Sequence, residues 1–402
     1  MNRFLPTSSP EVRKVDGRSA LRDFLHVPHR LYHGNPYWVA PLYGEEKRFL
    51  SPRHNHFLSR NPVALFVCYR GGIPVGRIAA IINRDHLERY RDHVGFFGFF
   101  DSENDRETAA ALLQTASRWV KDRGAQIMRG PANFSINSTA GLLVDGFEDP
   151  PQIMMPYNHA YAVDLLEANG FKRCMTFLAY EVSRDQIRFP AAVSRLEERL
   201  ARNGTTIRHL ASRYLNRDAE LIRTVFNQAW SGNWGFIPFS IEEVQQDFKR
   251  VRPFFKEDLV FIAEHKGRPV GFCLSLPDIN QALQPLGGRL MPFNWLRLLL
   301  GIRKISRLRV ILMGVAADHR RRGIDLVFYK KTFDHAEKYG IHTAELSWIL
   351  EDNRDMNRVL EHINAHCYKR YAIYEKHLNR TLLSSFHMVS GTGRSGQSTD
   401  IP

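Results

Sequence analysis

The alternation of apolar runs and turn residues predicts two similar β-hairpins in distant parts of the chain. The first reads VALFVCYR at 63–70, then GGIP, then VGRIAAII at 75–82, and EHKGRPVGFCLSL at 264–276 repeats it. Gly76 and Gly271 are 195 residues apart, and so are Asn158 and Asn353 in two later segments. Two unrelated landmarks with one spacing predict tandem domains of the same fold.

Helical and extended patterns follow one another in a similar order in both repeats. The elements predicted for the first repeat are a helix at 106–123, a strand at 126–128, a helix at 161–170 and a strand at 176–182. Those predicted for the second are a strand at 205–210, helices at 218–230 and 241–250, a strand at 343–350, a helix at 353–365 and a strand at 368–378. An amphipathic helix at 187–203 should connect the repeats, and residues 1–18 are expected to be a flexible lead. A short helical pattern starts at Ala20, and the aromatic, proline-punctuated stretch at 29–58 that follows it resists assignment.

In the second repeat, an arginine-rich turn connects a predicted strand to a predicted helix. Residues 310–315 form an apolar run, and helical spacing starts at Leu326 and stops at Gly340. The turn between them contains Arg320, Arg321, Arg322, Gly323, Ile324 and Asp325. Because a helix start has unpaired N–H groups and the positive end of its dipole, this turn could bind a diphosphate. The alternative is a solvated basic turn before a surface helix.

The Gly- and Pro-rich loop GPANFSINSTAGLLVDGFEDPP at 130–151 is the other candidate phosphate binder. It has almost no basic residues, so we expect it instead to shape a pocket between the repeats, because ordered loops often carry sites.

Composition limits the kinds of partner and compartment. The 402 residues suit two domains, and apolar and charged fractions of 44% and 24% are typical of a globular protein. A net charge of +14 indicates an anionic partner, which could be a nucleic acid, a phosphate-bearing cofactor or a membrane surface. Four dispersed cysteines suggest neither disulfides nor a metal site, and the absence of a signal-like or spanning apolar run leads us to expect a cytoplasmic protein.

The arginine-rich turn resembles the coenzyme A loop of the GCN5-related N-acyltransferases, whose pattern is Gln/Arg-x-x-Gly-x-Gly/Ala after a strand. Arg320 and Gly323 match its first two fixed positions, and Asp325 departs from the third. The chain as a whole resembles the bacterial two-domain family of this superfamily, which includes the bacterial ceramide synthases. The segments that carry this resemblance are LYHGNPYWVAPL, VGRIAAIIN, GFFGFFD, RGPANFSIN, YNHAYAVDLLEANGF, NWGFIPF and AELSWILEDNRDMNRVLEHI.

The resemblance implies a fold, a cofactor and a division of the chain. The fold would be a tandem of mixed α/β acyltransferase domains, and acyl-CoA would be the donor, without a metal. The expected division is an extension at 1–60, a degenerate domain at 61–183, a linker helix at 184–204, an acyl-CoA-binding domain at 205–380 and a disordered tail at 381–402. The residues expected to bind the cofactor are Met313, Val315, Arg320, Arg321, Arg322, Gly323, Ile324, Asp325 and Asn353.

Acyl transfer to an amine also needs a base and a donor for the leaving thiolate. We favour Glu345 as the base, shielded by Trp348, with Glu351 as the second choice; the alternative is that Glu345 is structural. The family's usual acid would be a tyrosine seven residues after Asn353, but Leu360 occupies that position. The replacements considered are Tyr371 and Tyr374.

The acceptor is expected to be an amine, with a lipidic sphingoid base as one candidate. The alternatives are a small-molecule N-acetyltransferase and a non-catalytic acyl-CoA or lipid-binding protein. Nucleic acid is disfavoured, because no known binding motif appears.

The insertion at 279–306 combines an apolar helix, about 293–302, with cations that no acidic residue opposes. We expect it to border an acyl tunnel and, through 286–305, to touch an anionic membrane, which would place the protein at the inner face. The alternative is a helix packed on the first domain with its arginines pointing outward.

Overall fold

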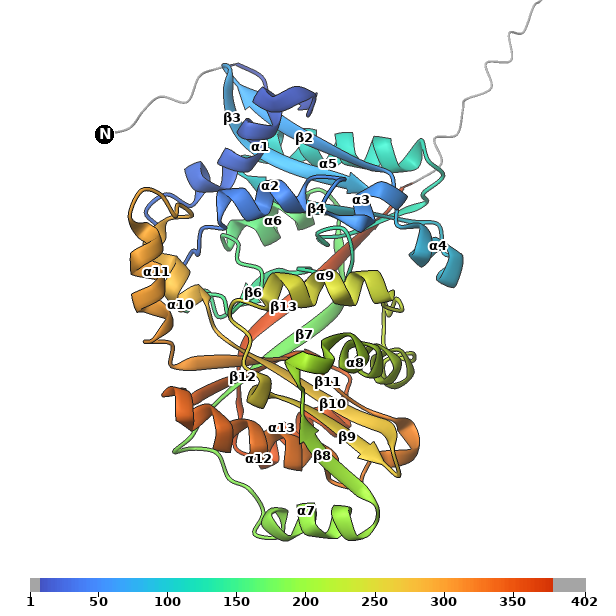
Figure 1. The fold of residues 1–402 in the computed structure, drawn as a ribbon. Coiled ribbons are helices and arrows are strands. Elements are labelled where there is room, and N and C mark those ends of the chain that lie inside the picture. The colour runs from blue at the N-terminus through green and yellow to red at the C-terminus, as the bar shows by residue number, and fades with distance from the viewer. Residues whose placement is uncertain (1–7, 379–402) are drawn as a thin grey trace, which may run out of the picture.

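Thirteen strands of residues 8–378, the part of the chain that the computed structural model describes, form one continuous sheet (Figure 1). The strand order is β1-β2-β3-β4-β5-β13-β7-β12-β11-β10-β9-β8, and β6 pairs with β13 beside this path. None of the helices within these residues is long and apolar enough to cross a bilayer. The predicted tail at 381–402 lies outside the described residues.

Each half of the chain contributes three antiparallel pairings followed by a parallel one. The pairs β1–β2, β2–β3 and β3–β4 are antiparallel and β4–β5 is parallel; β8–β9, β9–β10, β10–β11 and β11–β12 repeat this order. The predicted tandem of mixed α/β folds is therefore confirmed.

The elements of the first half are β1 Glu11–Lys14, α1 Gly17–Leu31, α2 Tyr43–Phe49, α3 His56–Arg60, β2 Val63–Arg70, β3 Ile73–Ile81, α4 Arg84–Tyr90, β4 Val94–Ser102, α5 Arg106–Lys121, β5 Ile127–Gly130, β6 Leu142–Asp145, α6 Tyr161–Ala168 and β7 Lys172–Ser183. Those of the second half are α7 Val193–Arg202, β8 Thr205–His209, α8 Leu215–Ala229, α9 Ile241–Val251, β9 Val260–His265, β10 Arg268–Pro277, α10 Asn280–Leu283, α11 Asn294–Ile302, β11 Arg307–Val315, α12 Ile324–Ala336, β12 Thr343–Leu350, α13 Arg354–His362 and β13 His366–His377.

The last strand of each half crosses into the other half. β7, made by the first half, pairs along β12 of the second, and β13, at the end of the chain, lies between β5 and β7 (Figure 1). All three of these pairings are antiparallel. The domain limits 61–183 and 205–380 therefore remain a proposed division of the chain. One strand from each side of this division, β7 and β13, pairs with strands of the other side.

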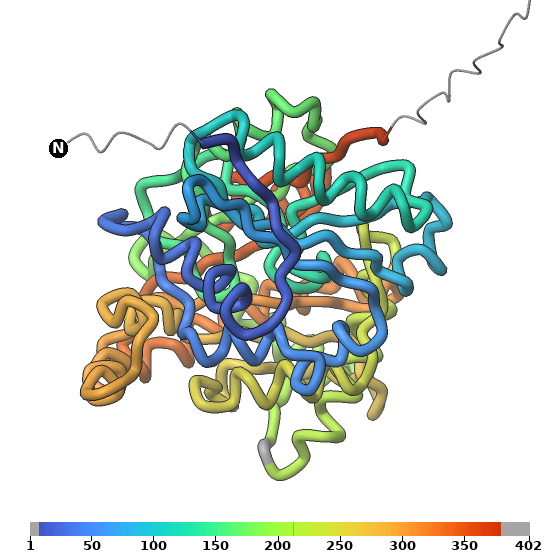
Figure 2. The backbone as a smooth tube through the Cα atoms, turned by 90° about the horizontal axis from the view of Figure 1, so that it is seen from above, coloured from blue at the N-terminus to red at the C-terminus, as the bar shows by residue number. Residues whose placement is uncertain are grey.

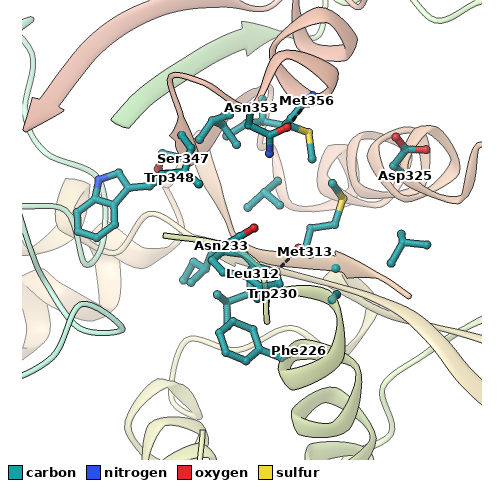
Figure 3. Close-up of a pocket in the computed structure, with 18 of the residues that line it drawn as sticks. Phe226, Trp230, Asn233, Leu312, Met313, Asp325, Ser347, Trp348, Asn353 and Met356 are labelled. Atoms are coloured by element: carbon teal, nitrogen blue, oxygen red, sulfur yellow. Dashed lines mark hydrogen bonds between the residues drawn. The ribbon is translucent and has the colours of Figure 1, made fainter. Parts of the chain in front are cut away.

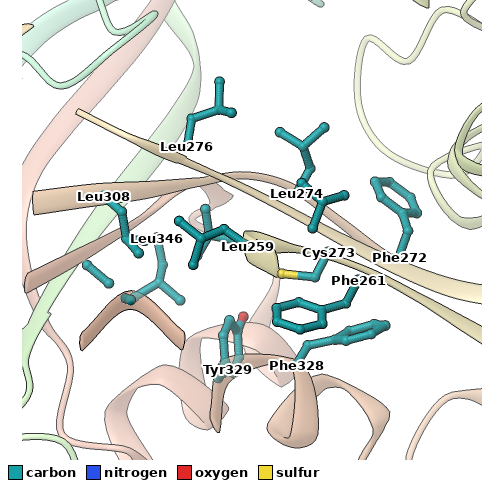
Figure 4. Close-up of a cluster of buried hydrophobic side chains, with 14 of the residues drawn as sticks. Leu259, Phe261, Phe272, Cys273, Leu274, Leu276, Leu308, Phe328, Tyr329 and Leu346 are labelled. Carbon is teal, nitrogen blue, oxygen red and sulfur yellow. The ribbon is translucent and has the colours of Figure 1, made fainter. Parts of the chain in front are cut away.

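The core of the second half lies between the sheet and α12. Phe261 of β9 extends toward Phe328 of α12, with 6.4 Å between the ring centroids, whereas Phe272 of β10 points to the opposite face of the sheet (Figure 4). All three side chains are fully buried. Burying one such aromatic side chain stabilises the fold by about 1.5–3 kcal/mol. This packing fixes α12, and hence its first turn, against the strands that precede it.

Two expectations for the N-terminal region were wrong or incomplete. Residues 11–14, expected in a flexible lead, form β1, where Val12 pairs with Cys68 at the edge of the sheet. The short helical pattern predicted from Ala20 is part of α1, whose Phe24 and Leu25 are fully buried, and the unassigned stretch that follows contains α2 and most of α3. Pro28 lies inside α1, and this helix-breaking residue obscured the end of the helix at Leu31.

The insertion at 279–306 forms α10 and α11 and projects from the edge of the molecule (Figure 2). Its base contacts the first half, because Tyr43 N donates to Gly288 O at 3.3 Å and Gln284 Nε2 donates to Pro36 O at 2.7 Å. None of the α11 residues is buried. The alternative of a helix whose apolar side is packed on the first domain is therefore wrong.

Candidate active site

The two central strands of the second half separate and leave a cavity between them. β11 and β12 pair in parallel from Arg307 with Thr343 to Val310 with Leu346, and the pairing then stops although both strands continue. A cavity of about 620 Å³ lies where they diverge (Figure 3). This volume is in the usual range for a small-molecule site. The backbone of β11 beyond Val310 has no strand partner on this side, so those of its polar groups that no side chain uses are available to a ligand.

Aromatic side chains form much of the cavity wall. Phe226 of α8 and Trp230, the residue that follows this helix, stack at 4.9 Å between ring centroids, and Phe236 comes from the loop beyond them. The Trp230 indole Nε1 donates to the Met313 carbonyl oxygen at 3.0 Å (Figure 3). Trp230 therefore holds the backbone of β11 in place, whereas the sequence had predicted it only as the last residue of a helix at 218–230.

The first half supplies another part of the wall. Ile136, Asn137 and Ser138, from the loop at 130–151, line the cavity, and Asn137 Nδ2 donates to Ile237 O at 2.9 Å. A Cβ on Gly235 would lie 2.8 Å from Ile136 Cδ1, so the two loops are in close contact. The prediction that this loop shapes a pocket between the halves is confirmed.

The arginines of the turn have different roles from one another. Arg320 Nε donates to Val315 O at 3.2 Å and its Nη2 to Ala229 O at 2.6 Å, so its guanidinium ties the end of β11 to the end of α8. Arg322 Nη2 donates to Asp318 O at 2.8 Å and does not line the cavity. Arg321 lines the cavity mouth with its side chain 89% exposed. Its guanidinium lies 3.5 Å from the Asp355 carboxylate in an exposed ion pair, which contributes little to stability, so Arg321 is the arginine of the turn that is accessible to an anionic ligand.

The start of α12 has the conformation that a phosphate-binding turn requires. Gly323 precedes the helix with φ of +80°, and a Cβ there would lie 2.4 Å from Leu196 Cδ2, so both the backbone angle and the space demand glycine. Ile324 and Asp325 line the cavity. Burial raises the pKa of the Asp325 carboxyl, the group that stands at the third fixed position of the loop pattern.

Asn353 lies across the cavity from Trp230 and Phe226 (Figure 3). Its side chain accepts a hydrogen bond from Met356 N at 3.2 Å and so caps α13 (Figure 3). Met313 and Val315 also line the cavity, from β11.

Glu345 lies behind the cavity rather than in its wall. Its carboxylate is fully buried, 3.3 Å from the Arg309 guanidinium, and accepts hydrogen bonds from Ser347 at 2.6 Å and from the Tyr368 hydroxyl. Burial lowers the pKa of the Arg309 guanidinium, and the Glu345 carboxylate opposes this shift. Only Arg309 and Ser347 of this group border the cavity.

The structure does not bring the other predicted catalytic residues to the cavity. Glu351 is exposed and pairs with Arg370 at 3.0 Å. Tyr374 is fully buried in the core of the first half, where its hydroxyl lies 3.5 Å from Glu167. Tyr371 is also fully buried and does not line the cavity. The reason is the strand exchange, which carries both tyrosines of β13 away from the second half.

A tyrosine that sequence reasoning missed does line the cavity. The Tyr329 hydroxyl, on α12, donates to Met356 Sδ at 3.4 Å, and burial raises its pKa well above the usual value, so it keeps its proton. Leu360, at the family's usual tyrosine position, is fully buried in the core. The available signal was the spacing, because Tyr329 follows Asp325 by one helical turn and must share its face.

Comparisons with known proteins agree with this architecture. Over 376 residues the chain is 35% identical to protein YghO of Escherichia coli (strain K12), covering 91% of this chain and 95% of that protein. Over 365 residues it is 33% identical to the bacterial ceramide synthase of Caulobacter vibrioides (strain NA1000 / CB15N), covering 89% of this chain and 95% of the relative. The sequence matches no family model.

A solved tandem GNAT protein from the clavulanic acid biosynthesis pathway has the same fold. The TM-score is 0.53 at 10% identity, over 92% of this chain and 98% of that one. The order of the strands, the site between two diverging strands and the repeat of this arrangement in both halves define a tandem GCN5-related N-acyltransferase fold. The chain belongs to the bacterial two-domain N-acyltransferase family that includes protein YghO and the bacterial ceramide synthase.

Proposed function

We propose that this protein transfers a long acyl chain from acyl-CoA to the amine of a lipid, such as a sphingoid base. The observation that carries the proposal is the aromatic cavity between the splayed strands, which both halves of the chain line. The relative named as a bacterial ceramide synthase supports the same class of acceptor.

The donor would lie along the diverging ends of β11 and β12. Backbone N–H groups of β11 near Met313 and Val315 would donate to the thioester carbonyl, because no neighbouring strand uses that side. The diphosphate would meet the N–H groups at the start of α12, with Arg321 close to its negative charge. Arg320 would act indirectly by holding the end of β11 in place.

The test is thiol release by the purified protein with donors of increasing length and with two acceptors, a sphingoid base and a short water-soluble amine. Each methylene buried in the cavity is worth about 0.8 kcal/mol, so palmitoyl-CoA should exceed acetyl-CoA by at least about 100-fold in kcat/KM. Equal rates for both donors with the soluble amine would instead favour a small-molecule acetyltransferase. Binding of palmitoyl-CoA without release of thiol would favour a non-catalytic binding protein.

Arg321→Glu should weaken acyl-CoA binding at least tenfold, a loss of about 1.4 kcal/mol, because it places a negative charge at the cavity mouth. Isothermal calorimetry with a non-hydrolysable acyl-CoA analogue measures this directly. Arg213→Glu is the matched control, since Arg213 is also exposed but lies outside this cavity. Equal affinities of the two variants would contradict the placement of the diphosphate.

The exposed surface of the insertion supports a second part of the proposal, contact with an anionic bilayer. Eight large apolar side chains are exposed in the described part of the chain, and six of them belong to this segment: Met291, Phe293, Trp295, Leu296, Leu299 and Leu300. The basic side chains of Arg289, Arg297, Arg303 and Lys304 form no ion pair with any residue of the described chain. Apolar side chains beside cations suit an interfacial helix. The expectation that the segment also borders the tunnel was wrong, because no residue of 279–306 lines the cavity.

The double variant Trp295→Glu/Leu299→Glu should lose most of its binding to vesicles of phosphatidylglycerol in a flotation assay. Wild type should float with these vesicles, less so at high salt, and should remain unbound with phosphatidylcholine. Ile73→Glu is the matched control, since Ile73 is 44% exposed at a hairpin of the other half. If the double variant floats as well as wild type, α11 is not the membrane contact.

A further inference from the structure

Ser347 lies where the two strands of the site separate. Val310 with Leu346 is the last pair between β11 and β12, and Ser347 follows it directly. The pairing of β12 with β7 also shifts between Leu346 and Ile349, so Ser347 lies outside the regular ladder on both sides. Its side chain borders the cavity although the residue is only 5% exposed (Figure 3).

The hydroxyl of Ser347 contacts Arg309 and Glu345 at short distances and the Met155 sulfur, a weaker acceptor, at 3.6 Å. Arg309 Nε donates to Ser347 Oγ at 2.9 Å, and Ser347 Oγ donates to Glu345 Oε1 at 2.6 Å. Because Arg309 offers only donors, it fixes the direction of this chain of hydrogen bonds. A hydroxyl oxygen has two lone pairs, so one of them remains available to a group in the cavity.

Glu345 contacts two residues that border the cavity, Arg309 and Ser347, and of these two only Ser347 can accept a proton from a ligand. Its carboxylate is fully buried among Arg309, Ser347 and Tyr368, and Glu345 itself does not line the cavity. A carboxylate in this position cannot touch an acceptor amine directly. Any proton it receives from the amine must pass through Ser347.

We propose that Ser347 is a catalytic residue that relays the proton of the acceptor amine to Glu345. This inference rests on the proposed function and goes beyond it by naming the group that touches the nitrogen. The amine nitrogen bonds to the thioester carbon and becomes acidic as its lone pair is used. Its proton passes to Ser347 Oγ while the Ser347 proton passes to Glu345 Oε1, and the C–S bond then breaks to release the thiolate.

Arg309 is a positioning residue in this scheme. It holds the Ser347 oxygen by one hydrogen bond and lies 3.3 Å from Glu345 Oε1, so it orients both members of the relay. Its positive charge at the cavity wall also favours the neutral form of an approaching amine, which is the form that attacks.

The test compares Ser347→Ala, Ser347→Thr and Glu345→Gln with wild type, using palmitoyl-CoA and a sphingoid base. Removal of one base typically costs 100-fold or more, so Ser347→Ala and Glu345→Gln should each lower kcat by about that factor. KM and the affinity for a non-hydrolysable acyl-CoA analogue should stay within about twofold, and Ser347→Thr, which keeps the hydroxyl, should restore most of kcat. The double variant Ser347→Ala/Glu345→Gln should be no slower than the worse single variant, because both residues serve one transfer.

The possible results separate the relay from the function on which it rests. If the wild type is active and Ser347→Ala has the same kcat, the relay is overturned while the proposed function stands. The same conclusion follows if the losses of the two single variants multiply in the double variant. Restoration by threonine together with non-additive losses would support it, since a merely structural role of Ser347 would alter stability and affinity instead. A wild-type protein that releases no thiol from any donor would overturn both the relay and the proposed function.

Discussion

A chain that ends at Ala365 is expected to lose the folded state of both halves, because it lacks β13. This strand pairs with β5, β6 and β7, and its removal would leave their edges open in the centre of the sheet. It also supplies fully buried side chains to two cores: Ala372 and Tyr374 to one, and Tyr371 and Ile373 to the other. We expect this variant to be insoluble or to show no cooperative thermal unfolding by circular dichroism.

The matched control is a chain that ends at Leu378, which keeps β13 and the described contacts. It should unfold within about 2 °C of the full chain, because it keeps every strand pairing of β13. A cooperative transition of the shorter chain at the same temperature as the control would show that the exchanged strand is dispensable.

Arg309→Met is expected to lower the free energy of unfolding by about 3–5 kcal/mol, because it leaves the Glu345 carboxylate buried without its cation. Methionine approximates the length of the arginine stem, so the loss reports mainly the charge. Urea unfolding followed by tryptophan fluorescence measures the difference. The double variant Arg309→Met/Glu345→Gln should recover part of it, since the uncompensated charge is then gone.

Arg370→Met is the control for this measurement. Arg370 pairs with Glu351 at 3.0 Å, but its side chain is 43% exposed and that of Glu351 52% exposed. An ion pair in contact with water contributes about 0–1 kcal/mol, so this variant should be close to wild type. Similar losses in the free energy of unfolding for the two arginine variants would show that the buried Arg309–Glu345 ion pair contributes no more to stability than the exposed Arg370–Glu351 pair.

Local patterns were enough to predict most elements and the repeat, but not the partners of the last strands. The segments TFLAYEV in β7 and YKRYAIYEKHL in β13 are both apolar enough to lie at the centre of a sheet. Each is antiparallel to both of its main neighbours, so period-two alternation is satisfied whether or not the strands are exchanged. For this reason the sequence also misplaced Tyr371 and Tyr374, which would have belonged to the site only without the exchange.

The site itself was partly predictable for a related reason. A strand followed by a glycine-led helix start has a local signature, and the structure places Val315, Arg321, Ile324 and Asp325 around one cavity. The direction of a side chain within a turn has no such signature. Arg320 turns back to two carbonyl groups, whereas Arg321 next to it points to the cavity mouth. Ser347 depends on the register shift in β12, which no local pattern reveals.

The place of β13 also affects how this protein emerges from the ribosome. The open edge of β5 can be covered only after the end of the chain has been made, because β13 is its neighbour. At about 5–20 residues per second, the delay between synthesis of Gly130 and His366 is roughly 10–50 s. Throughout that interval an apolar strand edge is open to neighbouring nascent chains. Translation speed and chaperone supply should therefore influence the yield of this protein more than that of a tandem protein whose domains each close on their own.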